Sequence, residues 1–129
     1  MTEVAEITIR RCADTVDQYD DVNRVYTLGL ADHADIEDAT LGFLFSILEP
    51  DAGPEGYSLT AEPGQRTAFS AVAQCEVSDG FLRLVFTPDA AAALELPGTL
   101  SLRLEIDDYA KTVLAKGLGR VGIQCVDLS

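Results

Sequence analysis

The stretch Thr67–Leu96, TAFSAVAQCEVSDGFLRLVFTPDAAAALEL, decides the fold of this chain. Its apolar run Phe81–Phe86 follows the turn Ser78-Asp79-Gly80, and Asp-Gly between two apolar runs indicates a hairpin because glycine adopts positive φ at little cost. Thr87-Pro88-Asp89 then supplies a hydroxyl N-cap, a proline suited to the first helical turn and an acid near the positive end of the helix dipole. The stretch therefore predicts two antiparallel strands followed by a short helix that begins at Pro88.

Strands are also predicted on both sides of this stretch, from alternation and from β-branched or aromatic residues. The predicted strands are Val4–Arg11, Val22–Ala31, Leu41–Glu49, Tyr57–Glu62, Thr67–Val77 and Thr99–Ile106. At Leu41–Glu49 a short helix fits the pattern equally well, and the loop of Pro50, Gly53, Pro54 and Gly56 directly after it favours a strand. Ala13–Asp21 is expected to be a loop or a frayed helical turn, and Asp32–Asp38 a second loop.

The C-terminal part predicts a second helix and an undecided tail. Asp107 and Asp108 offer an acidic helix start, and the helix is expected to end at Gly117 or Gly119. The tail Val121–Ser129 is expected either to add an edge strand or to fray. Short connections favour antiparallel pairing. The predicted fold class is α+β, a mainly antiparallel sheet with two short helices in the C-terminal half, in a single domain of residues 1–129.

The charge of the chain is strongly negative and unevenly distributed. The 129 residues carry a formal net charge of −13, and residues 1–62 hold 14 acidic and 3 basic residues, a net charge of −11. A negative field of this kind repels nucleic acid and anionic membranes and speeds encounter with basic proteins. We therefore expect no nucleic-acid partner and no membrane partner.

The cysteines and the N-terminus favour a cytoplasmic protein. Cys12, Cys75 and Cys125 are odd in number and form no C-x-x-C pair, so reduced thiols are the simplest interpretation. The N-terminus MTEVAEITIRRC lacks the basic start and the long apolar run of a signal peptide. The apolar run Leu41–Leu48 is too short to span a bilayer.

Three sequence features bear on whether the chain has a nucleotide-binding, metal-binding or catalytic site. Gly117–Gly122 matches G-x-G-x-x-G, but a helix precedes it where a dinucleotide site needs a strand, so a glycine-terminated helix is favoured. His33 lies among Asp32, Asp35, Glu37 and Asp38 at a spacing unlike an EF-hand, so we expect no metal site. With one histidine and no nucleophile motif, we expect no catalytic residues and no cofactor.

Two acidic segments remain as the candidate partner-binding site. Its residues are Asp14, Asp17, Asp20, Asp21, Asp32, Asp35, Glu37 and Asp38. One interpretation is a solvated surface that keeps the protein soluble. The other is a docking surface for a basic partner, with Tyr19 and Tyr26 as aromatic anchors. The sequence leaves open whether the two segments share one side of the molecule or lie at its two ends.

A resemblance rests on the order of segments between Gly56 and Gly122. GYSLTAEPGQRTAFSAVAQCEV is followed by SDGFLRLVFTPDAAAALEL, then by TLSLRLEID and the helical AKTVLAKGLGRV. In this order they resemble the immunity protein 10 family of bacterial polymorphic toxin systems. Where relatives tend to have an aromatic residue followed by glycines, this chain has Phe69-Ser70-Ala71. The resemblance implies an α+β domain that binds and blocks a toxin of the producing cell or its kin, without turnover or cofactor.

Three hypotheses follow. The first is a cytoplasmic immunity protein, not an enzyme, whose acidic N-terminal half binds a cognate toxin domain that is basic, with a nuclease as the activity that fits best. The second is a small enzyme or small-ligand-binding domain with a carboxylate-lined pocket near Leu41–Leu48. The third is an interaction module that forms a homodimer through a sheet edge, at the Leu100 strand or the tail.

Overall fold

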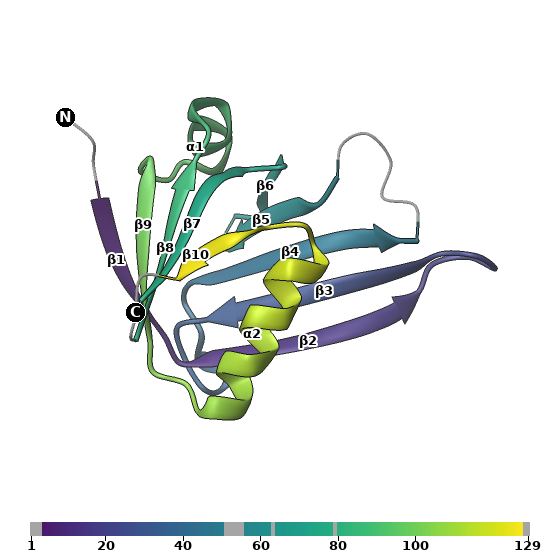
Figure 1. Ribbon diagram of the computed structural model, residues 1–129, viewed down its shortest axis with the longest axis horizontal. Coiled ribbons are helices and arrows are strands. Elements are labelled where there is room, and N and C mark those ends of the chain that lie inside the picture. The colour runs from purple at the N-terminus through teal and green to yellow at the C-terminus, as the bar shows by residue number, and fades with distance from the viewer. Residues whose placement is uncertain (1–3, 51–55, 63, 79, 128–129) are drawn as a thin grey trace.

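The computed structural model describes residues 4–50, 56–62, 64–78 and 80–127. Within them, two five-stranded sheets and two α-helices confirm the α+β class (Figure 1). The elements are β1 (Val4–Ile9), β2 (Arg11–Gln18), β3 (Arg24–Ala31), the 3₁₀ turn η1 (Ile36–Asp38), β4 (Gly42–Glu49), β5 (Ser58–Glu62), β6 (Arg66–Phe69), β7 (Val72–Ser78), β8 (Phe81–Phe86), α1 (Pro88–Leu94), β9 (Thr99–Leu104), α2 (Asp108–Arg120) and β10 (Cys125–Asp127).

The strands form two sheets where one was expected. Their orders are β1-β9-β8-β7-β10 and β2-β3-β4-β5-β6, and we call these sheet A and sheet B. All neighbours are antiparallel except two pairs in sheet A, β1 with β9 and β10 with β7. These parallel pairs form because the first and last strands join the sheet through long connections, and α2 lies in the connection from β9 to β10. The Leu100 strand, β9, is an interior strand, so it offers no edge for a homodimer, whereas the tail strand β10 is an edge.

The segment Ala13–Asp21 is a strand for most of its length, so the prediction of a loop or helical turn is wrong. β2 begins at Arg11 and pairs with β3 along its whole length. The chain moves from sheet A to sheet B at Arg10, whose backbone N–H donates to the carbonyl of Ala31 at 2.9 Å. β2 is an edge strand with almost every residue exposed, so it needs no apolar alternation, and that signal is absent from its sequence.

The predicted strand Thr67–Val77 is two strands, one in each sheet. β6 closes the edge of sheet B, and after Ser70 and Ala71 the chain enters sheet A as β7. Ser70 has a φ of 49°, in the left-handed region that favours glycine, which is where the resembling family tends to have glycines. The two predicted hairpins are confirmed as β5–β6 and β7–β8. The turn residues Pro63 and Asp79, and residues 51–55 of the predicted loop, lie outside the described residues.

Both helices begin where predicted. The hydroxyl of Thr87 accepts a hydrogen bond from the Ala90 N–H at 3.2 Å, and the Asp107 carboxylate accepts one from the Ala110 N–H at 2.8 Å. α2 does not end at Gly117 or Gly119 but continues to Arg120. Propensity pointed to an earlier end, and tertiary packing overrides it, because α2 lies across β2 and β3 (Figure 1).

One hydrophobic cluster joins both sheets and both helices. Sheet A contributes side chains such as Leu84 and Leu102, sheet B contributes Phe45, and α2 contributes Leu118, all of them at most 2% exposed. Burying one large apolar side chain contributes about 1.5–3 kcal/mol to the free energy of folding. This cluster is therefore the main source of stability in the fold.

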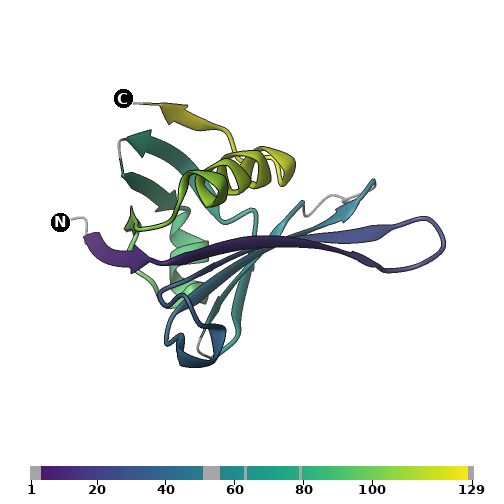
Figure 2. The ribbon, with the colours of Figure 1, turned by 90° about the horizontal axis from the view of Figure 1, so that it is seen from below.

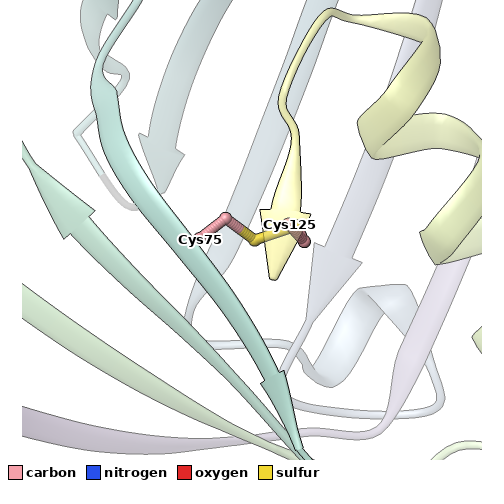
Figure 3. The surroundings of a disulfide bond; sticks show 2 residues. All are labelled: Cys75 and Cys125. Carbon is pink, nitrogen blue, oxygen red and sulfur yellow. A yellow bond between two sulfur atoms is a disulfide. The ribbon is translucent and has the colours of Figure 1, made fainter. Parts of the chain in front are cut away.

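A disulfide joins Cys75 of β7 to Cys125 of β10 (Figure 3). The prediction that all cysteines are reduced thiols is therefore wrong for this pair. Parallel pairing of β10 with β7 places the two residues directly opposite each other, with their Cα atoms 4.5 Å apart. A separation of 50 residues carries no local signal for such a bond, so only the fold reveals it. Cys12 is a free thiol, and burial, followed by the charge of Asp14, raises its pKa to about 12.

Candidate functional site

The eight acidic residues do not form one cluster: Asp14 and Asp17 lie on β2, and the other six lie in the turn and the loop at the two ends of β3. Asp20 and Asp21 occupy the turn of the β2–β3 hairpin, which extends away from the rest of the molecule (Figure 2). Asp32–Asp38 forms the β3–β4 loop at the other end of the strand. An eight-residue strand separates them by about 24 Å, at about 3.4 Å per residue. The structure therefore answers the question that the sequence left open.

Four of the eight carboxylates accept hydrogen bonds that shape the fold. Asp20 accepts from the Val22 and Asn23 N–H groups at 2.8 and 2.7 Å, and these backbone bonds, the one from Asn23 first, lower its pKa. Asp35 accepts from the Glu37 N–H at 3.1 Å. Asp32 accepts from the backbone and hydroxyl of Thr40. Desolvation raises the pKa of Asp32, yet the hydrogen bonds from the Thr40 hydroxyl and from the backbone of Leu41, Thr40 and Asp32 itself together outweigh it, and the pKa is lowered.

The fourth of these carboxylates, Asp14, belongs to a network beneath α2. The Tyr26 hydroxyl donates to Asp14 at 2.9 Å, and burial followed by this bond raises the pKa of Tyr26. The guanidinium of Arg120 lies 4.2 Å from the centre of the Tyr26 ring and binds the Glu49 carboxylate through two nitrogens, at 2.7 and 2.9 Å. The hydrogen bonds from Arg120 lower the pKa of Glu49, because they favour the charged carboxylate. This ion pair links the end of α2 to the end of β4.

Asp17, Asp21, Glu37 and Asp38 form a second group, and we call them the unpaired acids. Their carboxylates make no hydrogen bond and no ion pair with any other residue that the structure describes. All four are exposed. No ion pair with a described residue offsets their charge, so these four carboxylates contribute to the external negative field.

The two predicted aromatic anchors have different surroundings. Tyr19 is 63% exposed beside the hairpin turn, where a partner can reach it. Tyr26 is 1% exposed beneath Arg120 and cannot serve as an anchor, so that prediction is wrong. Val22, which the sequence reasoning did not single out, is 74% exposed in the same turn. Its exposure follows from the protruding hairpin, and the sequence shows no signal for it.

A hollow of about 440 Å³ lies on sheet B near Leu41–Leu44, where a pocket was predicted. The hollow is lined by Arg11, Ala13, Thr15, Thr27, Gly29, Leu30, Ala31, Ala39, Thr40, Leu41, Gly42, Phe43, Leu44 and Glu62. Among the described residues, Glu62 is the one carboxylate in this lining, so no group of convergent described carboxylates of the kind used for acid–base catalysis lines it. Small and apolar residues dominate the surface, which is typical of a binding surface.

A second hollow, of about 750 Å³, lies between α2 and sheet A. Of the described residues that line it, Lys111 is the one that carries a charge, and apolar side chains such as Leu82 and Leu114 form most of the rest. Within residues 4–50, 56–62, 64–78 and 80–127, no three His, Cys, Asp or Glu side chains are placed to hold a metal ion. The His33 ring nitrogen Nδ1 instead accepts a hydrogen bond from the Asp35 N–H at 3.0 Å. The described residues thus form two largely apolar hollows and no metal-holding group of such side chains.

The comparison with protein families decides the assignment. The family model of immunity protein 10 matches residues 11–112, which is well over half of the chain. The chain belongs to the immunity protein 10 family. The match includes β2, β3 and the acidic segments, which lie before the region on which the sequence resemblance rested. A search of curated proteins and a search of solved structures each gave no match. No helix in the described part of the chain is long and apolar enough to cross a membrane.

Proposed function

We propose that this immunity protein binds a cognate toxin domain in a stoichiometric complex and blocks it without catalysis. Membership of the immunity protein 10 family carries this proposal, because an immunity protein of a polymorphic toxin system acts against a toxin. Apolar hollows without a set of convergent carboxylates support binding over turnover. We place the complex in the cytoplasm of the producing cell.

We further propose that the toxin is basic and that the eight acidic residues steer its approach. They are Asp14, Asp17, Asp20, Asp21, Asp32, Asp35, Glu37 and Asp38, in the half of the chain with a net charge of −11. The unpaired acids act on the partner directly, and the other four act through the shape of the hairpin and the loop as well as through charge. A nuclease fits best, because an enzyme that binds a polyanion presents a basic groove that an acidic protein can cover.

Co-expression tests the function itself. The chain is produced together with the toxin domain encoded directly upstream, and survival is scored beside a pull-down at low and at physiological salt. The proposal predicts survival and a one-to-one complex that weakens as salt rises, because screening reduces attraction between exposed charges. Cell death without a complex would contradict it.

Charge reversal tests the steering. Asp17→Lys with Asp21→Lys, and separately Glu37→Lys with Asp38→Lys, each change the net charge by four units. A matched control reverses Glu6 and Glu105, which are exposed, engaged in no described ion pair and belong to or border sheet A. Stopped-flow association at low salt should slow about tenfold or more for the test pairs, within the range of electrostatic steering. Equal slowing by the control would show that only net charge matters, and unchanged rates in the test pairs would refute steering.

A further inference from the structure

We propose that the 440 Å³ hollow on sheet B receives an apolar side chain from a cationic segment of the toxin. This inference rests on the proposed function and names the surface that performs it. The acidic residues supply long-range attraction, whereas the hollow supplies a close-fitting contact. A pocket filled by one large side chain is the usual source of affinity at the centre of a protein interface.

The hollow exists because one cross-strand row of the sheet places two small residues beside a large one. Ala13, Gly29, Leu44, Thr60 and Thr67 are paired in register across the five strands β2 to β6, so they lie on one face. Because Ala13 has a small side chain and Gly29 has none, the surface of the sheet is recessed at their end of this row. A Cβ atom at Gly29 would approach Leu44 Cδ2 to 3.2 Å, so glycine keeps this floor open. Leu44, which is 38% exposed, forms an apolar wall.

The β3–β4 loop forms another wall, and Asp32 holds it in place. The Asp32 carboxylate accepts hydrogen bonds from Thr40, and the Asp32 N–H donates to the Leu41 carbonyl at 3.1 Å. Thr40 and Leu41 both line the hollow, so this acidic residue shapes the cavity as well as charging its surroundings. A volume of about 440 Å³ far exceeds the ~30 Å³ that a water molecule occupies in the liquid, so a large side chain fits.

The acidic residues in and beside the hollow favour a segment of a basic protein as the molecule that fills it. Glu62 lies in the lining, Asp38 directly precedes the lining residue Ala39, and Asp17 is on the outward side of β2 two residues after Thr15. Arg11 is the single cation of the lining. A second copy of this chain would bring another net charge of −13 to the same surface, which opposes self-association. Lysine or arginine beside an apolar residue therefore complements the hollow and its rim.

A matched pair of tryptophan substitutions tests the inference. Ala13 and Thr67 are both exposed, both on edge strands and both in the same cross-strand row, but only Ala13 lines the hollow. Ala13→Trp should fill the hollow and weaken toxin affinity at least tenfold through faster dissociation. Thr67→Trp should bind the toxin within about twofold of the unsubstituted chain. Unchanged affinity for Ala13→Trp would overturn the inference, and so would an equal loss for Thr67→Trp.

Further measurements keep the test decisive. If Ala13→Trp unfolds at markedly lower denaturant, Thr15→Trp, exposed on the same strand and in the same lining, replaces it. Sedimentation of the chain alone tests whether a second copy fills the hollow. If the unsubstituted chain is a dimer and Ala13→Trp is a monomer, the assignment of the hollow to the toxin is overturned. If the unsubstituted chain binds the toxin while all tryptophan variants bind equally, the hollow is refuted and the proposed function stands. Failure of the unsubstituted chain to bind refutes the proposed function itself.

Discussion

The two faces of sheet B use the same five strands for different purposes. On the inner face, the row Asp14–Leu28–Phe45–Leu59–Ala68 carries large apolar residues at its centre, and Leu28, Phe45 and Leu59 are 0% exposed. On the outer face, the adjacent row Ala13–Gly29–Leu44–Thr60–Thr67 is small or polar except for Leu44, and its first three residues line a hollow. Side chains alternate between faces along each strand, so neighbouring residues in the sequence belong separately to the core and to the surface of the hollow.

This difference means that the outer face can change without loss of the fold. The inner face is covered by α2 and shares its core with sheet A, so its side-chain volumes are fixed by packing. The outer face is less tightly packed, because side chains such as Leu44 are exposed there. We propose that the outer face varies with the toxin that it binds while the inner face stays constant.

The largest effect is expected from two adjacent residues on opposite faces. Phe45→Ala should lower the free energy of unfolding by about 3–5 kcal/mol, because a fully buried aromatic side chain leaves a cavity. Leu44→Ala should cost about 1 kcal/mol or less, because that side chain is 38% exposed. Urea denaturation measures both values. Similar losses in the free energy of unfolding for the two variants would mean that the outer face is packed as tightly as the inner face. That result would contradict the difference between the two faces.

The disulfide is expected to come next, because it fixes the segment that follows α2 and so helps to keep the inner face covered. Replacing Cys75 and Cys125 by alanine removes a cross-link across 50 residues and should cost about 2–4 kcal/mol. Thermal unfolding with and without a reducing agent gives the same information for the unsubstituted chain. Disulfides persist chiefly in oxidising compartments. Mass spectrometry of alkylated protein from the producing cell therefore tests the cytoplasmic placement, which a fully oxidised pair would oppose.

A smaller effect separates two glycines of the G-x-G-x-x-G motif. A Cβ atom at Gly117 would lie 2.6 Å from the Tyr26 hydroxyl and within 2.9 Å of Leu28, so Gly117→Ala should destabilise by about 1–3 kcal/mol through overpacking. Gly119, in the same helix, meets nothing within 4 Å. Gly119→Ala should stabilise by up to about 1 kcal/mol from helix propensity alone. If both substitutions change the free energy of unfolding by the same amount in urea denaturation, α2 does not pack closely against the inner face.

The smallest effect concerns Asp20, which lies in the hairpin turn beyond both faces. Backbone hydrogen bonds lower its folded-state pKa, so its contribution to stability is present above the ordinary aspartate pKa and is lost as pH falls through the folded value. Carboxyl ¹³C chemical shifts should show a titration midpoint below the ordinary range, with little change in the melting temperature near neutral pH. A midpoint at or above the ordinary value would show that the Val22 and Asn23 bonds do not hold the turn.

Local signals in the sequence were sufficient for several elements. Capping at Thr87 and Asp107 located both helix starts, and strict alternation located the strand that contains Leu100 and Leu102. Other features depend on contacts distant in sequence. β2 shows no alternation because an exposed edge strand does not require it, and the Cys75–Cys125 bond follows only from the parallel docking of β10.

The candidate site was predictable in composition but not in arrangement. The acidic residues were evident from charge, yet their distribution over β2 and the two ends of β3 required the hairpin register. The hollow required a register across three strands, which places Ala13 beside Gly29 and Gly29 beside Leu44. The hydrophobic pattern of a strand helps to set its register, but the exposed strand β2 lacks such a pattern, so sequence reasoning pointed to a pocket near Leu41–Leu48 but could not supply its lining.

We propose that this immunity protein blocks a toxin by stoichiometric binding. Calorimetric titration with the toxin domain encoded directly upstream, at low and at physiological salt, is the sharpest test of that stoichiometry. We predict saturation at one toxin domain per chain, with an affinity that falls as salt rises because the attraction is largely between exposed charges. Absence of saturable binding at low salt would contradict the account, as would toxin inactivation at well below one equivalent of the chain.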